Sequence, residues 1–316
     1  MILFEERKSA EKRDAMEQLE LRADSEFQKT GNALIGIWSK DSANQKVCSK
    51  RRMSQPGISG TLMLVFAICV PLPLIAQAVA AKPTPPAPQN SNVQVPFVGC
   101  KSDGQVGPVS APAGKSKTVQ IAAELAEQLA FYKAKNGSGV LAPRGWYCFG
   151  QYGSNGSDLY VAPQPIDEKL VFTPNWSGFS GPAVQVINEN GETSGRFEVA
   201  QIIARVFPAH VAFVSVVIKA GVGPASSFPS GPYPQDQLTY RNNEIVEYQT
   251  PANAEGLGTQ SKLQKNSSPI VGVEILTGAS SKLSLSSLAT RLPPNLTNLT
   301  PAIVQQLESD SAKPKR

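Results

Sequence analysis

The densest group of side chains able to recognise a ligand lies in residues 139–160, GVLAPRGWYCFGQYGSNGSDLY. Arg144 offers a planar fork of hydrogen-bond donors, and Trp146 and Tyr152 offer aromatic faces. Ser154 and Asn155 lie in a Gly-rich turn that adds backbone amides. A guanidinium beside aromatic rings suits sugars or peptide stems. We therefore expect Arg144, Trp146, Tyr152, Ser154 and Asn155 to contribute to an exposed surface for a ligand or a protein partner.

The same stretch also fits a purely structural role. Because side chains alternate across a strand, Trp146 and Cys148 share one face, and Tyr147 and Phe149 share the other. One of these faces must then be core. Residues 153–156 would make a hairpin turn. In this interpretation the aromatic rings pack around a disulfide, and the segment binds nothing.

Nucleophilic catalysis finds little support in the sequence. The segment GFSGP at 178–182 faintly resembles the nucleophile loop of trypsin-like proteases, but the acid before Ser180 and one glycine are missing. The only histidine, His210, follows Ser180, the reverse of that family's order. No G-x-S-x-G elbow occurs. We expect His210 to be structural.

Carboxylate chemistry needs only two acids across a cleft, as in a glycosidase. The sequence gives no distance between any two of them, so it cannot select a pair. A carboxylate-dependent hydrolase of the cell envelope is therefore the alternative to a non-enzymatic binding protein. An acid pair lining the deepest pocket would favour the enzyme, and an aromatic groove without acids would favour binding. The acids considered are Asp103, Asp158, Asp167, Glu168, Asp236, Glu244 and Glu247.

The cysteines indicate a disulfide rather than a metal site. Cys48 and Cys69 precede the end of an apolar leader, and only Cys100 and Cys148 follow it. Two cysteines in an exported domain most simply form one disulfide, because the compartment beyond the membrane is oxidising. With one histidine and no C-x-x-C pair, we expect no metal. We also expect no cofactor.

Composition excludes several classes of protein. The 26 prolines and 25 glycines argue against a coiled coil or an all-helical bundle, because helix interiors exclude both residues. The formal net charge of +5 is small and spread along the chain, so we expect no nucleic-acid partner. An envelope component or a protein partner remains.

Residues 53–81 have the layout of a secretory signal peptide. Nine consecutive apolar residues, 62–70, follow the basic cluster at 50–52, and small residues end the stretch. We expect export to the periplasm or the cell envelope, with cleavage after Ala80 or Ala81.

The alternative is an uncleaved inner-membrane anchor with the charged residues 1–52 in the cytoplasm, which is the orientation that the positive-inside rule predicts. A long charged segment is unusual before a signal, so Met53 is a second candidate start, although it would lose most of the basic cluster. Both alternatives stay open. Either way, membrane contact is expected only through residues 58–81.

The remaining chain predicts one exported α+β domain with long loops rich in proline and glycine. A Pro-rich linker is expected over 82–96, a globular domain over 97–308 and a flexible tail over 309–316. Hydrophobic spacing predicts helices at 122–135, at 195–207 with Ser194 as the cap, and after a capping Thr300. It predicts strands at 140–149, 159–162, 210–219 and 270–276.

Three segments resemble those of a group of uncharacterised exported bacterial proteins. They are VPFVGCKSDGQVGP, GVLAPRGWYCFGQYGSNG and, at 247–263, EYQTPANAEGLGTQSKL. The resemblance covers most of residues 95–308. It implies a protein of the bacterial envelope, and it carries no activity or functional residue.

Overall fold

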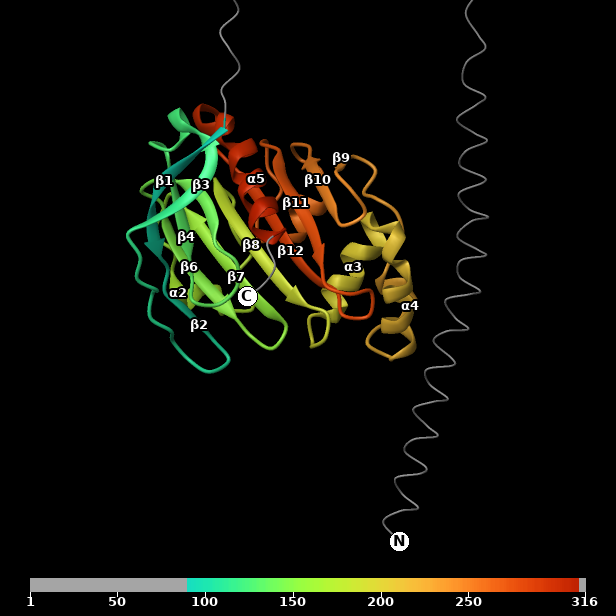
Figure 1. Ribbon diagram of the computed structural model, residues 1–316. Helices are drawn as coiled ribbons and strands as arrows, with labels where there is room; N and C mark the ends of the chain where they lie inside the picture. The colour runs from blue at the N-terminus through green and yellow to red at the C-terminus, as the bar shows by residue number, and fades with distance from the viewer. Residues whose placement is uncertain (1–89, 313–316) are drawn as a thin grey trace, which may run out of the picture. The chain divides into compact units, whose positions relative to one another are not determined.

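Strand pairing organises residues 90–312, the part of the chain that the computed structural model describes, into two sheets with a few helices (Figure 1). The fold is therefore the mixed α+β class that the sequence predicts. The strands are β1 (Asn90–Gly99), β2 (Ser102–Gly104), β3 (Ser116–Ala122), β4 (Leu129–Lys133), β5 (Val140–Pro143), β6 (Tyr147–Tyr152), β7 (Gly156–Ala162), β8 (Ala183–Asn190), β9 (Gln237–Tyr240), β10 (Ile245–Thr250), β11 (Ile270–Thr277) and β12 (Ser284–Arg291). The α-helices are α2 (Glu168–Val171), α3 (Arg196–Val206), α4 (Val211–Lys219) and α5 (Thr300–Ser311). The short 3-10 turns are η1 (Ala123–Leu125), η2 (Pro208–His210), η3 (Ala225–Ser227), η4 (Leu257–Gln260) and η5 (Pro294–Leu299).

The smaller sheet has four strands in the order β3-β1-β4-β5. Strand β1 changes partners along its length: residues 90–96 pair antiparallel with β3, and residues 97–99 pair parallel with β4. Pro96 stands at the change of partner, where its missing N–H removes one ladder hydrogen bond. β1 thus belongs to both halves of the sheet.

The larger sheet has eight strands in the order β2-β6-β7-β8-β12-β11-β10-β9. All neighbours are antiparallel except β2 and β6. Because side chains alternate across each strand, the sheet has two distinct faces.

One face of the larger sheet packs into an apolar core with the smaller sheet and α5. Val161, Val186, Val273 and Leu288 belong to this core and are almost fully buried. The opposite face meets a second core, built around α3 and α4, which lie together beside the β10–β12 side of the sheet in Figure 1. The central strands of the larger sheet are therefore covered on both sides, and a polar side chain there is largely removed from water.

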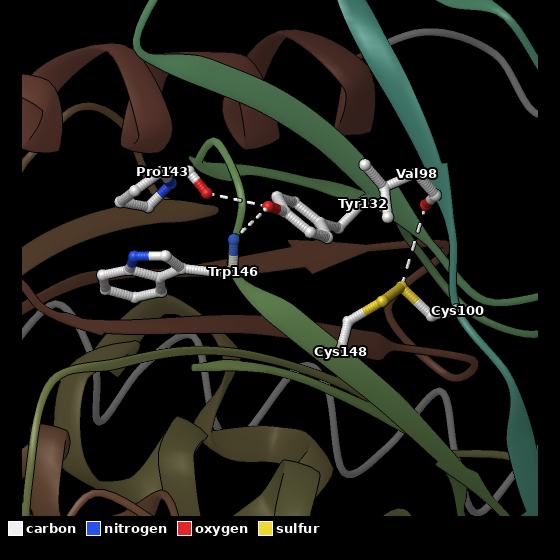
Figure 2. The surroundings of a disulfide bond; sticks show 6 residues. All are labelled: Val98, Cys100, Tyr132, Pro143, Trp146 and Cys148. Carbon is white, nitrogen blue, oxygen red and sulfur yellow. Dashed lines mark hydrogen bonds between the residues drawn. A yellow bond between two sulfur atoms is a disulfide. The ribbon is translucent and has the colours of Figure 1, made fainter. Parts of the chain in front are cut away.

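A disulfide joins the two sheets, as the sequence predicts (Figure 2). Cys100 follows β1 directly, Cys148 lies in β6, and their Cα atoms are 5.4 Å apart. Beside the bond, the buried Tyr132 hydroxyl donates to the Pro143 carbonyl at 2.8 Å and accepts from the Trp146 backbone N–H at 3.0 Å. These contacts fix β4, β5 and the start of β6 to one another.

Two predicted elements are wrong. Residues 122–135 contain the end of β3, the turn η1 and strand β4 instead of a helix. Leu129–Lys133 is a central strand between β1 and β5, buried over four of its five residues. A strand buried on both faces is apolar in succession, and such a run also matches helical spacing.

Residues 210–219 were predicted to be a strand and form the last residue of η2 and helix α4. Phe213, Val214 and Val217 are buried in the α3–α4 core, while Val216 is exposed. The apolar residues on the remaining sides obscure the helical period, and tertiary packing overrides the strand preference of valine. Within residues 90–312, no helix is long and apolar enough to span a membrane.

The strand predicted at 140–149 is two strands, β5 and β6, which lie in different sheets and are separated by residues 144–146. The remaining predicted elements are confirmed, with shifted boundaries. The second helix is α3, but its N-cap is Gly195 rather than Ser194, and the last helix begins at Thr300 itself after Leu299. Residues 90–96 of the predicted linker lie in β1, and residues 309–311 of the predicted tail lie in α5. The predictions for the charged segment, the signal, its cleavage at Ala80 or Ala81 and the rest of the linker lie outside the described residues.

Candidate functional site

The five residues predicted to form a binding surface divide into two groups. Arg144 and Trp146 precede β6. The Arg144 Nη2 donates to the Ala126 carbonyl at 2.9 Å, and Trp146 packs against the core between the two sheets, called the main core below. Because β6 has six residues, the strand rise puts these two about 20 Å from the turn at its other end. They do not share one surface with that turn.

The other three predicted residues lie at the far end of β6. The Tyr152 hydroxyl donates to the Gly107 carbonyl at 2.6 Å, and the Ser154 and Ser194 hydroxyls are 2.9 Å apart. The Asn155 amide donates to Glu189 Oε1 at 3.3 Å. The β6–β7 turn is thereby attached to β8 and to the start of α3, and Asn155 reaches a cavity beneath that helix.

The alternation of residues 146–149 is confirmed, and neither face is fully exposed. Cys148 and Trp146 pack against the main core, and Phe149 is buried in a separate cluster with Tyr160. Only Tyr147, at 51% exposure, leaves a ring in solvent. The aromatic rings of this stretch therefore pack mostly inward, as the structural interpretation expects.

A cavity of about 400 Å³ lies between α3, the η4 segment and the second face of the larger sheet. Four carboxyl groups line it: Asp158 from β7, Glu189 from β8, Glu198 from α3 and Glu274 from β11. Glutamine amides and serine hydroxyls complete its polar wall, and Ile187, Ile202, Tyr248, Leu257 and Leu285 form its apolar wall.

The strand register explains why acids from different strands meet here. Asp158 pairs with Ile187, Ile187 with Ser287, and Ser287 with Glu274, so the four residues form one row across β7, β8, β12 and β11. Neighbouring strands are about 4.8 Å apart, which puts the backbones of Asp158 and Glu274 about 14 Å from each other. The row therefore has an acid at each end and an isoleucine and a serine between them.

Asp158 is held by an amide bridge. Gln185 Nε2 donates to Asp158 Oδ1 at 2.8 Å, and Gln185 Oε1 accepts the Lys262 backbone N–H at 2.6 Å. Burial raises the pKa of the Asp158 carboxyl to about 6, while the Gln185 hydrogen bond and the Lys262 charge act to lower it. Asp158 is therefore mostly ionised at pH 7.

Glu189 lies next to Asp158 on the neighbouring strand, one step diagonally along the register. Burial raises its pKa to about 8, and the charges of Glu198 and Asp158 act in the same direction. Gly195 allows this close packing, because a Cβ there would lie 2.7 Å from Glu189 Oε2 and 2.4 Å from the Asn155 carbonyl oxygen. Glu189 therefore keeps its proton at pH 7.

Glu274 occupies the other end of the row. The Ser287 hydroxyl donates to Glu274 Oε2, and the residue is only 2% exposed. Burial raises its pKa to about 8, and the charge of Asp236 adds to the effect. Asp236 is itself occupied by the Thr250 hydroxyl at 2.7 Å and the Leu257 N–H at 2.8 Å.

Sequence reasoning named two residues of the cavity, Asn155 and Asp158, and missed Glu189, Glu198 and Glu274. A usable signal existed for Glu274, because it interrupts the apolar strand IVGVEILT at a position where both faces are covered. A charge inside a run expected to be buried on both faces marks a polar site. No group of three or more metal-ligating side chains is arranged to hold an ion within residues 90–312.

The residues considered for serine-protease chemistry lie elsewhere. The Arg291 guanidinium holds the loop around Ser180 by donating to the carbonyls of Phe179 at 2.7 Å and Gly181 at 2.6 Å. His210 Nε2 lies 3.7 Å from Glu244 Oε1. The Ser180 loop is therefore held in place by structural hydrogen bonds. Neither Ser180 nor His210 lines the cavity that contains the four carboxyl groups, called the carboxyl cavity below.

Comparisons with protein-family models, with curated proteins and with solved structures find no match for this chain.

Proposed function

We propose that this protein is an exported, non-enzymatic binding protein of the bacterial envelope that holds a small polar ligand in the carboxyl cavity. The observation that carries the proposal is the cavity itself. Its volume of about 400 Å³ lies within the range of small-molecule sites, and its wall combines apolar side chains with convergent polar groups. Buried polar groups are costly unless they bind something, so a ligand recovers part of that cost.

The compartment rests on separate support. A disulfide between Cys100 and Cys148 is compatible with an oxidising environment. The apolar stretch at 62–70 and the resemblance to exported bacterial proteins point in the same direction. The ligand is then a molecule that reaches the envelope.

Native mass spectrometry of the protein taken from the cells that produce it tests the binding proposal. We expect a small molecule to remain bound and to be lost in Gln260→Trp, because Gln260 is exposed at the rim of the cavity and a larger side chain closes it. The control Gln128→Trp places the same bulk on an exposed turn away from the cavity. Equal occupancy in both variants would contradict binding in the cavity.

A second candidate is a carboxylate-dependent hydrolase, and one observation favours it. Asp158 and Glu189 have pKa values of about 6 and about 8, so at pH 7 one carboxylate is ready to accept a proton and the other carboxyl is ready to donate one. Diagonal neighbours on adjacent strands are about 7–8 Å apart, which is compatible with two acids flanking a scissile bond.

Turnover separates the two candidates. In the hydrolase, Asp158→Asn abolishes release of the chromophore from nitrophenyl glycosides while the substrate still binds. In the binding protein, the wild type releases none, and the ligand recovered from it is chemically unchanged.

A further inference from the structure

Two carboxyl oxygens in the cavity wall lack any hydrogen-bond partner among the described residues. They are Glu189 Oε2 and Glu198 Oε2. Glu189 is only 7% exposed, and its other oxygen already accepts from Asn155. The two side chains come from opposite walls, the sheet and α3, and lie close enough for the charge of one to act on the other. One end of the cavity thus presents two buried carboxyl oxygens that no other described residue hydrogen-bonds.

We propose that the cavity binds a small aliphatic amine, with the ammonium group donating to Glu189 and Glu198 and the alkyl body lying against the apolar wall. This inference rests on the proposed binding function and names its ligand class. An ammonium carries three donors and no acceptor, so it can satisfy both oxygens and also compensate their charge. A hydroxyl supplies one donor and leaves the charge uncompensated.

The charges around the site favour a cation. Asp158, Glu189, Glu198 and Glu274 line the cavity, and the charge of Asp236 acts on Glu274. Lys262 is the one cationic side chain among the described residues that line the cavity. The Tyr248 hydroxyl already donates to the Leu288 carbonyl. Glu189 and Glu274 are neutral at pH 7, but a cation beside them favours their ionised forms, so a bound ammonium gains Coulomb energy from the acids of the lining.

Apolar side chains from the same sheet face and helix as the two acids match an alkyl chain. Ile187 and Leu285 from the sheet face Ile202 from α3 and Leu257 from η4. These side chains give an ammonium-bearing alkyl chain apolar surface to bury, at about 25 cal/mol per Å². A strongly hydrated inorganic cation gains nothing from that wall.

Binding of an amine should be coupled to release of a proton from Glu189. Its carboxyl keeps a proton at pH 7, and an ammonium binds better to the ionised form. Binding therefore releases a proton, and the affinity rises as the pH increases toward 8. Above that value the affinity levels off until the amine itself loses its charge, near pH 10.

Calorimetric titration of the full chain with putrescine and cadaverine, compared with the diols of the same chain length, tests the inference. We expect the diamines to bind about tenfold more tightly than the diols at pH 8. A tenfold difference in affinity corresponds to about 1.4 kcal/mol of binding free energy. Titration in buffers of different ionisation enthalpy should report release of about one proton per bound diamine at pH 7.

The variant Glu189→Gln should weaken diamine binding about tenfold and reduce its dependence on pH between 6 and 8, while Asp158 and Glu274 still titrate in the cavity. Because glutamine has the shape of the protonated side chain, the fold should be kept, and a thermal melt verifies it. Glu192→Gln is the matched control: it removes an acid three residues away that is exposed and paired with Lys282. It should leave the affinity unchanged.

The outcomes separate this inference from the binding function on which it rests. Diols that bind as tightly as diamines, with both lost in Gln260→Trp, would overturn the amine and keep the binding cavity. Diamine binding that Glu189→Gln and Glu192→Gln weaken equally would overturn the assignment to this site. A wild type that binds neither class overturns the amine, and the native mass measurement then decides the cavity by itself.

Discussion

At the residue scale, the distinctive feature of this protein is a set of carboxyl groups buried on one face of the larger sheet. A carboxyl removed from water favours its protonated form, and this is the main cause of the raised pKa values of Glu189 and Glu274. Among residues 90–312 neither residue has a cationic partner, and the Ser287 hydroxyl donates a hydrogen bond to Glu274. The two acids are therefore tolerated as neutral groups and become costly when they ionise.

Glu274→Gln should make the stability of the protein less dependent on pH. The unfolded glutamate loses its proton near pH 4.5 and the folded one near pH 8, so the folded state binds more protons between these values. The free energy of unfolding then falls as the pH rises through this window, by up to about 1.4 kcal/mol per pH unit for one proton. The variant removes this contribution and should be more stable than the wild type at pH 8.

Urea unfolding between pH 5 and pH 8.5 measures the effect. The control is Glu255→Gln, because hydrogen bonds from Lys265 and Thr259 lower the pKa of Glu255 and move its titration below this window. The control should keep the wild-type slope. Parallel stability curves for Glu274→Gln and the wild type would show that Glu274 does not titrate in this way.

At the element scale, the spacing of hydrophobic residues predicted the correct element type where a segment has one polar side. It predicted the wrong type where a segment is apolar on nearly all sides. Helix α3 keeps Arg196 and Arg205 away from its buried Val199, Ile203 and Val206, so its period is visible in the sequence. Strand β4 and helix α4 lack a continuous polar side, and their predicted types are exchanged: a helix was expected for the strand and a strand for the helix. Their type depends on neighbours that are distant in sequence.

The cavity was less predictable than the fold for a related reason. Asp158 and Glu274 are 116 positions apart and share one row only because β7, β8, β12 and β11 pair in that order and register. Local sequence specifies that each is in a strand or a turn, but it does not specify strand order. The cysteines were easier, because the chemistry of an oxidising compartment leaves one simple pairing for two thiols.

Cys148→Ser should lower the free energy of unfolding by about 2–5 kcal/mol. The disulfide connects the end of β1 in the smaller sheet to β6 in the larger one across 48 positions. Its loss raises the conformational entropy of the unfolded chain and removes the covalent link between two sheets that share a core. The serine also leaves Cys100, which is 1% exposed, as an unpaired thiol within residues 90–312.

Denaturant unfolding of the oxidised wild type, the reduced wild type and Cys148→Ser makes the comparison. Reduction and substitution should lower the stability by similar amounts, because each removes the same bond. A variant as stable as the oxidised wild type would mean that packing between the sheets suffices without the bond.

At the scale of the whole molecule, one large sheet divides two cores of different character. On one face, the smaller sheet and α5 form an apolar core around Val161, Val186 and Leu288. On the other, α3 and α4 cover an apolar region beside the carboxyl row. The first core, with its disulfide, gives the second face a rigid support, and a binding cavity on rigid strands needs little reordering when a ligand enters.

The final prediction concerns the compartment in which this molecule matures. When the full chain is produced in a bacterium, we expect the envelope fraction to contain a species cleaved after Ala80 or Ala81, in which Cys100 and Cys148 are joined. The expectation rests on the apolar stretch at 62–70 with small residues after it, which is the layout of a secretory signal, and on the disulfide, which persists only on an oxidising side of the membrane. Intact-mass measurement with and without thiol alkylation decides both points on one sample. A mass that retains residues 53–81 would indicate an anchor instead of a cleaved signal, and two alkylated thiols in the envelope fraction would contradict maturation in an oxidising compartment.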